Sequence, residues 1–147
     1  MTTTIFFDMD GTIADLYGVD NWLDYLRNGD PFPYANAKAL LNLQALARVL
    51  NNLQRKGFRI EIISWLSKTS TAEYDKAVTL AKLAWLSTHL ASVSFDKINI
   101  VSYGTCKDTF RHNETDVLFD DEERNRKEWN GKAFDVNNII EILKGLK

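Results

Sequence analysis

The sequence of 147 residues contains a single cysteine, Cys106. One cysteine excludes an intramolecular disulfide, and a zinc site built on cysteines is not expected. The first ten residues, MTTTIFFDMD, lack the basic and apolar regions of a secretory signal, and no stretch approaches the ~20 apolar residues of a membrane span. We therefore expect a cytoplasmic protein with no membrane partner.

An excess of charge of one sign is also missing. The chain has 18 Lys and Arg against 20 Asp and Glu, a formal net charge of −2, with no long block of like charge. Proteins that bind duplex nucleic acid carry a basic footprint, so a duplex partner is not expected. Apolar residues make up 45% of the chain, which is ordinary for one globular domain that forms its core without disulfides.

Short apolar runs alternate with segments of helical periodicity along the chain. Strands are expected over residues 3–7, 58–65, 98–103 and 117–119, with a short fifth over 134–136. Helices are expected over residues 21–27, 35–56, 72–90 and 138–146. The alternation predicts βαβ units and therefore an α/β fold with a parallel sheet. Residues 13–35 are expected to form a small insertion that holds one short helix and a loop.

Polar residues follow the predicted strands at four places: Asp8-Met9-Asp10-Gly11-Thr12, Ser64, Lys107 and Asp120-Asp121. In an open parallel sheet the carboxyl ends of the strands meet at one edge, and ligands bind there. We therefore expect these four elements to converge, although they are far apart in the sequence.

The residue types at this edge indicate transfer of a phosphate ester. Four clustered aspartates repel one another unless some are protonated or a cation lies among them, and oxygen ligands alone favour Mg²⁺. Asp8 is then suited to attack phosphorus and form an aspartyl-phosphate, and Asp10 to protonate the leaving oxygen and later activate water. Ser64 and Lys107 offer a hydroxyl donor and a positive charge to the phosphoryl group.

Together these residues resemble the four motifs of the haloacid dehalogenase (HAD) superfamily of phosphohydrolases. DxDGT after a strand corresponds to residues 8–12, the Ser or Thr at a strand end to Ser64, the lysine to Lys107, and the acidic pair to Asp120 and Asp121. The motifs occur in order and span nearly the whole chain. The resemblance implies a three-layer Rossmann-like fold in a single domain, 1–147, with a minimal cap at about 13–35.

Within the superfamily the chain is similar to small 5′-nucleotidase-like members of phages and bacteria, related to the 5′(3′)-deoxyribonucleotidases. Segments 82–86 and 120–125 carry this narrower similarity. The cap of those enzymes is a larger helical subdomain, and reduced caps often accompany larger substrates or caps borrowed from another subunit.

The resemblance also implies roles for single residues. Asp8 is the nucleophile and a metal ligand, and Asp10 is the general acid and base, whose backbone carbonyl also binds Mg²⁺. Phosphate is held by Gly11, Thr12, Ser64 and Lys107. Asp121 is the favoured metal ligand, and Asp120 supports Lys107 or is the alternative ligand.

The predicted activity is Mg²⁺-dependent hydrolysis of a small phosphomonoester, with a nucleotide as substrate. A phosphatase for nucleic-acid ends or other phosphomonoesters is one alternative. A non-catalytic module that binds a phosphate ligand or a protein is another, and the intact pair Asp8 and Asp10 argues against it.

Five aromatic residues gather in the insertion: Tyr17, Trp22, Tyr25, Phe32 and Tyr34. One interpretation is that their rings only pack the insertion onto the domain, because aromatic side chains dominate burial in protein cores. The other is that Tyr17 and Trp22, which are closest in sequence to the Asp8–Thr12 loop, stack on the base of a nucleotide.

Overall fold

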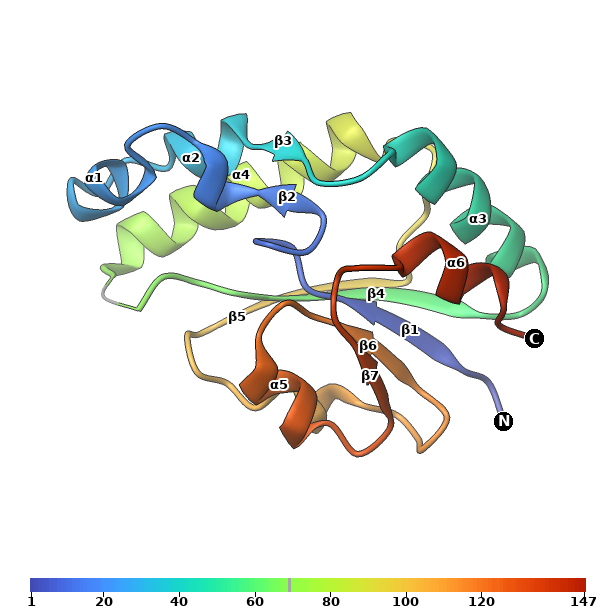
Figure 1. Ribbon diagram of the computed structural model, residues 1–147. Coiled ribbons are helices and arrows are strands. Elements are labelled where there is room, and N and C mark those ends of the chain that lie inside the picture. Colours follow the sequence, from blue (N-terminus) through green and yellow to red (C-terminus); the bar gives the residue numbers. More distant parts are fainter. Residues whose placement is uncertain (69) are drawn as a thin grey trace.

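A computed structural model describes residues 1–68 and 70–147 and contains a central sheet of five parallel strands (Figure 1). The strands are β1 (Thr4–Phe7), β4 (Arg59–Trp65), β5 (Lys97–Val101), β6 (Val117–Phe119) and β7 (Lys132–Phe134). Their spatial order is β5-β4-β1-β6-β7, so the direction of winding reverses between β1 and β6. Open α/β sheets bind ligands outside the carboxyl ends of the strands at this reversal.

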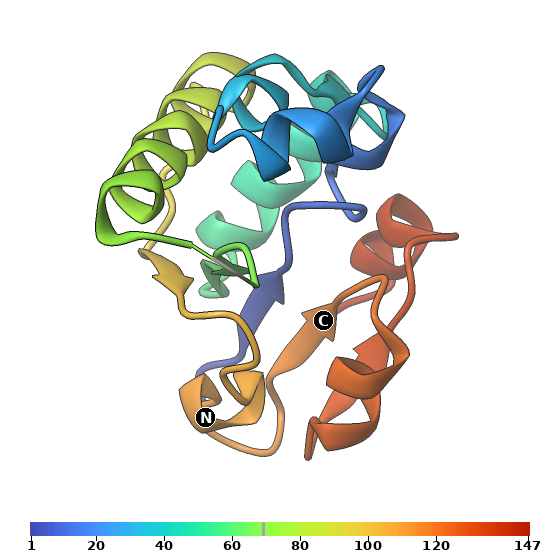
Figure 2. The ribbon, with the colours of Figure 1, turned by 90° about the vertical axis from the view of Figure 1, so that its left-hand side faces the viewer.

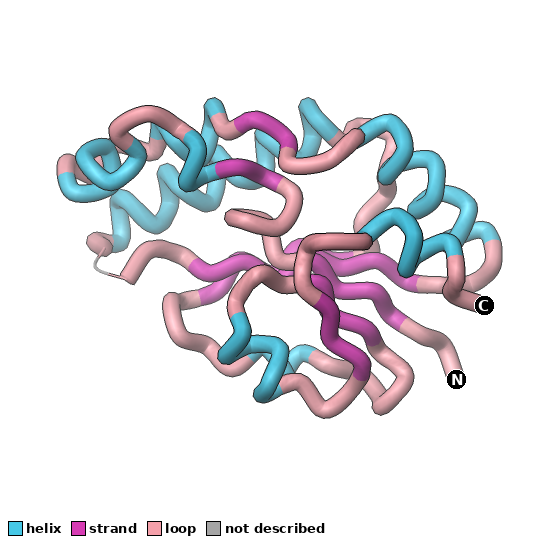
Figure 3. The backbone as a smooth tube through the Cα atoms, in the orientation of Figure 1, coloured by secondary structure: helices cyan, strands magenta, loops and turns pink. Residues whose placement is uncertain are grey.

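Helices cover both faces of the sheet, which gives three layers (Figures 1 and 3). One face carries α3 (Leu43–Arg55), α4 (Ala72–His89) and α6 (Ile139–Lys144). The other carries the 3₁₀ turn η2 (Lys107–Phe110) and α5 (Glu123–Glu128). The predicted α/β fold with a parallel sheet is confirmed.

Strand β1 is buried on both faces because it lies in the middle of the sheet. Successive side chains of a strand point to opposite faces. Ile5 and Phe7 pack in the larger core beneath α3, α4 and α6, whereas Phe6 packs in the smaller core with Trp129 on the other face. A continuous apolar run is what a central parallel strand requires, and it fixes the position of Asp8 at the strand's end.

A small layer follows β1 and lies beside α4 at the carboxyl end of the sheet (Figures 1 and 2). It consists of β2 (Ala14–Asp15), η1 (Leu16–Gly18), α1 (Trp22–Arg27), α2 (Phe32–Asn36) and β3 (Lys38–Ala39). The expectation of a single short helix here was wrong. A second helix forms because proline stands in the first turn of α2, where its fixed φ favours helix and its missing N–H costs nothing.

The long helix expected over 35–56 begins later, at Leu43. Lys38 and Ala39 instead pair with β2 in an antiparallel bridge. Asn42 then starts the helix, because its side chain accepts a hydrogen bond of 3.0 Å from the N–H of Ala45. The other predicted strands and helices are present with small shifts of their ends. None of the helices described is long and apolar enough to cross a membrane.

Candidate active site

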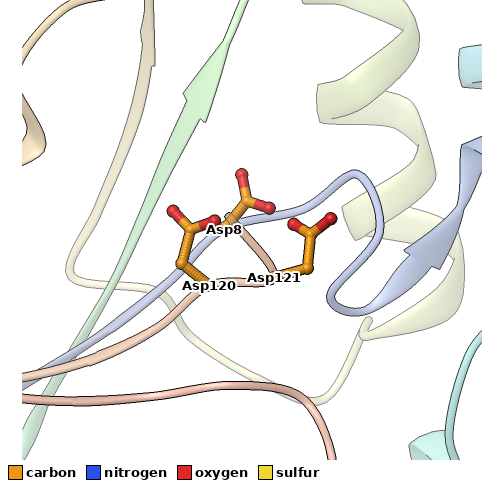
Figure 4. A group of neighbouring side chains, drawn as sticks. All are labelled: Asp8, Asp120 and Asp121. Atoms are coloured by element: carbon orange, nitrogen blue, oxygen red, sulfur yellow. The ribbon is translucent and has the colours of Figure 1, made fainter. Parts of the chain in front are cut away.

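Three carboxylates meet where β1 and β6 end. Asp8 directly follows β1, and its N–H donates to the carbonyl of Phe119 at 2.9 Å, which continues the pairing of the two strands. Asp120 and Asp121 directly follow β6. One oxygen of each carboxylate lies within 4.8 Å of the others, and Figure 4 shows the three side chains gathered together. The reversal point of the sheet therefore holds a compact, oxygen-only cluster.

The turn after Asp8 binds the two strand ends together. The Thr12 hydroxyl donates to Oδ2 of Asp8 at 2.9 Å, and the N–H of Asp121 donates to that hydroxyl at 3.2 Å. Gly11 has a φ of +81°, and a Cβ there would overlap the Asp121 carboxylate. Only glycine satisfies both the positive φ and the close approach. The N–H of Gly11 donates to the carbonyl of Ala14, which closes the turn.

Lys107 is buried between two of the acids. Its Nζ lies 2.9 Å from Oδ1 of Asp8 and 2.7 Å from Oδ2 of Asp120. Burial disfavours the charge of Lys107, but the two carboxylates outweigh burial and raise the pKa of Lys107 above its usual value. Asn125 also donates to Oδ2 of Asp120, at 3.1 Å. Asp120 thus supports Lys107, which is the contact that the resemblance implies.

The cluster carries more negative charge than Lys107 can balance. Burial and the neighbouring Asp8 raise the pKa values of both Asp120 and Asp121 above the usual range. Raised carboxyl pKa values mean that full ionisation costs free energy unless a further cation is present. Beside them, the buried Oδ1 of Asn125 has no protein donor. A hard divalent cation such as Mg²⁺ fits this set of oxygen donors.

Asp10 and Ser64 lie close to the cluster but contact a different lysine. Lys82 of α4 donates to Oδ2 of Asp10 at 2.9 Å and to the Ser64 hydroxyl at 2.6 Å. Burial, the largest effect, raises the pKa of Asp10 although Lys82 opposes it. With these contacts the structure brings all four predicted elements together.

Sequence reasoning gave Lys82 no role in the site. The signal was its position in α4, since Val78, Lys82 and Trp85 occupy one buried stripe of the helix. A lysine at a position where helical periodicity requires an apolar side chain needs a buried partner. That conflict between charge and periodicity could have identified it.

A cavity of about 230 Å³ opens over the carboxylates. Its charged wall contains Asp8, Asp10, Lys107, Asp120 and Asp121. Its apolar wall consists of Leu16, Tyr17, Trp22, Leu26, Tyr34, Trp65, Leu66 and Tyr103. Gly11, Thr12 and Ser64 do not belong to this lining. The volume is small beside the roughly 300–1,000 Å³ of common ligand pockets, so a larger ligand would extend past the mouth.

Both aromatic residues singled out in the sequence line the cavity. Tyr17 and Trp22 meet edge to face, with ring centroids 5.0 Å apart. Trp65 at the end of β4 and Tyr103 after β5 also line the cavity, and their ring centroids are 5.0 Å apart. By contrast, Tyr25 and Phe32 stack on each other at 4.7 Å and do not line it.

The comparisons with known proteins support the fold. No protein-family model matches the sequence, and no curated protein is significantly similar to it. Among solved structures, D,D-heptose 1,7-bisphosphate phosphatase from Burkholderia thailandensis matches with a TM-score of 0.53 and 15% sequence identity. The match covers 86% of this chain and 70% of that one. The chain therefore has the Rossmann-like fold expected of the HAD superfamily.

Proposed function

We propose that this protein is a Mg²⁺-dependent phosphomonoesterase that forms an aspartyl-phosphate on Asp8. The observation that carries the proposal is the cluster of Asp8, Asp120 and Asp121 with Lys107 between two of them, at the floor of a cavity. A phosphoryl group bound there meets a nucleophile, a fixed positive charge and ligands for a hard cation. The structural neighbour is itself a phosphatase by name, which supports the same reaction class.

The reaction proceeds in two displacements. In the first, a carboxylate oxygen of Asp8 bonds to phosphorus while the ester P–O bond breaks, and Asp10 gives its proton to the leaving oxygen. In the second, Asp10 takes a proton from water, whose oxygen attacks phosphorus and releases Asp8. The raised pKa of Asp10 favours the protonated form that the first displacement needs.

The remaining residues hold charge and position. Lys107 stabilises the phosphoryl oxygens while keeping Asp8 in place. Gly11 and Thr12 shape the turn beside the phosphate, and Ser64 offers its hydroxyl. When bound by Asp8, Asp121 and the backbone carbonyl of Asp10, Mg²⁺ supplies positive charge that offsets repulsion between the carboxylates and the phosphate.

We propose a nucleotide as the substrate because the cavity wall beyond the carboxylates is aromatic. Tyr17 and Trp22 lie on that wall, and a nucleobase that stacks on either gains roughly 1–3 kcal/mol with little dependence on its identity. The enzyme would therefore prefer nucleotides over sugar phosphates and discriminate weakly among bases. This aromatic wall is the part of the molecule that favours the 5′-nucleotidase-like subtype.

Turnover of p-nitrophenyl phosphate tests the reaction class. We expect hydrolysis with Mg²⁺, its loss with EDTA, and its return when excess Mg²⁺ is added. Absence of turnover in purified protein with Mg²⁺ would favour the non-catalytic binding module. A panel of 5′- and 3′-nucleotides, sugar phosphates and phosphorylated DNA ends then tests the substrate, and faster hydrolysis of DNA ends than of nucleotides would support the nucleic-acid alternative.

A further inference from the structure

Lys82 is a lysine buried completely within the domain, on the face of α4 turned toward the strand ends. Its Nζ lies 2.9 Å from Oδ2 of Asp10, 2.6 Å from the Ser64 hydroxyl and 2.7 Å from the carbonyl of Trp65. An ammonium group has three N–H donors. Each of them therefore has an acceptor, which fixes the lysine and all three partners relative to one another.

The contact decides which way the Ser64 hydroxyl points. Lysine only donates, so the oxygen of Ser64 accepts from Lys82 and its own O–H must be directed elsewhere. Among the described residues, Lys82 is the hydrogen-bond partner of this hydroxyl. Lys82 thereby fixes the direction of this hydroxyl, which is buried completely and does not line the cavity.

The contact with Lys82 also makes the two carboxylate oxygens of Asp10 different. Oδ2 is held by Lys82, whereas Oδ1 has no hydrogen-bond partner among the residues that the structure describes. Asp10 lines the cavity, so its unheld oxygen is available to a ligand there. A carboxylate that exchanges a proton with a substrate must be fixed in direction as well as within reach.

We infer that Lys82 is a positioning residue, which orients Asp10 for proton transfer. The inference rests on the proposed function for the role of Asp10. A purely structural role for Lys82 makes a different prediction. Removing Lys82 alone leaves Asp10 without its buried partner, so a purely structural role predicts a loss of stability with equal effects on every substrate.

The test compares Lys82→Met with Lys76→Met, which removes an exposed lysine from the same helix. Each variant is assayed with Mg²⁺ on a nucleoside 5′-monophosphate, a poor leaving group, and on p-nitrophenyl phosphate, a good one. We expect Lys82→Met to lose about 10²-fold in kcat on the nucleotide and less than about 10-fold on p-nitrophenyl phosphate. Lys76→Met is expected to match the wild-type protein on both.

A double-mutant cycle separates positioning from indirect damage. If Lys82 acts through Asp10, adding Lys82→Met to Asp10→Asn causes little further loss on the nucleotide. Additive losses, equal losses on the two substrates, or Lys82→Met rates within about twofold of Lys76→Met would each overturn the inference while leaving the proposed function in place. If wild-type protein hydrolyses neither substrate, the proposed function itself fails.

A second variant, Lys82→Gln, keeps the test valid if Lys82→Met does not fold. Lys82→Gln is neutral, retains a polar group with N–H donors on a side chain one bond shorter, and removes the ionic attraction to Asp10. We expect it to fold and to show the same dependence on the leaving group. If neither variant folds, Lys82 serves the fold and the positioning role is overturned.

Discussion

Both ends of the central sheet hold buried carboxylates, but the protein compensates their negative charge differently at each end. At the carboxyl end, Asp8, Asp120 and Asp121 lie within 4.8 Å of one another beside a cavity, and one lysine lies between two of them. At the amino end, Asp116 precedes β6 with no exposed surface and lies apart from any such cluster.

Backbone N–H groups satisfy Asp116 completely. Its Oδ1 accepts from Thr4 at 2.8 Å, and its Oδ2 accepts from His112 at 2.7 Å and Asn113 at 3.1 Å. These hydrogen bonds connect the start of β1 to the loop before β6. Glu61 nearby is equally buried and accepts from Asn99 and His112.

The comparison shows what separates a structural acid from a functional one. Asp8 and Asp120 are buried like Asp116, and only Asp121 is exposed, so burial alone does not distinguish the two kinds. An acid whose oxygens are filled by protein donors stabilises the fold. The clustered acids also accept from protein donors, but three carboxylates share one lysine, so they retain a need for positive charge that a ligand can meet.

The largest expected effect is at the carboxyl end. Asp8→Asn removes the carboxylate that attacks phosphorus, so nearly all hydrolysis of p-nitrophenyl phosphate is expected to disappear. Thermal unfolding should stay close to that of the wild-type protein, because the amide relieves repulsion within the cluster. Turnover above the level of contamination or deamidation would rule out the covalent mechanism.

Asp10→Asn is the next largest change. General acid–base catalysis contributes about 10²–10⁴-fold, and a poor leaving group needs it most. We expect kcat on a nucleoside monophosphate to fall within that range, and kcat on p-nitrophenyl phosphate to fall much less. Equal losses on both substrates would assign Asp10 a different role.

Asp116→Ala tests the amino end, where we expect a loss of stability and no loss of activity. The variant leaves the N–H groups of Thr4, His112 and Asn113 without their acceptor. Stranded buried donors cost about 1–3 kcal/mol each when water cannot reach them, and we expect a loss of about 3 kcal/mol. The melting temperature would fall by roughly 10 °C, with kcat unchanged well below it. A lower kcat in folded protein would show that Asp116 also affects catalysis, which would contradict the comparison between the two ends.

The smallest effect concerns the aromatic wall above the carboxyl end. Tyr17→Ala or Trp22→Ala should raise KM for nucleotides by the equivalent of roughly 1–3 kcal/mol and affect p-nitrophenyl phosphate less. Phe32→Ala is the control, because Phe32 belongs to the same layer but does not line the cavity. If the first two variants weaken both substrates alike, or match Phe32→Ala, the rings only pack the layer.

Local patterns in the sequence were sufficient to predict the sheet and most of the acid cluster. The apolar run before Asp8 could only be a buried strand, and parallel strands bring their carboxyl ends together. The start of α3 was missed because Lys38 and Ala39 pair with β2, a tertiary contact that overrides helical periodicity. Lys82 was missed because its partner Asp10 is 72 residues away, and no short motif records such a contact.

The pairing of β1 has a consequence for biosynthesis. β1 pairs with β4 from Thr4↔Arg59 onward and with β6 from Ile5↔Val117 onward. A nascent chain that has left the ribosome only as far as His112 therefore carries Asp8 and Asp10 but has neither β6 nor the acids that follow it. Such long-range pairing forms slowly and last. The three-carboxylate cluster is thus absent until β6 and the acids after it have been synthesised, and it forms together with the sheet.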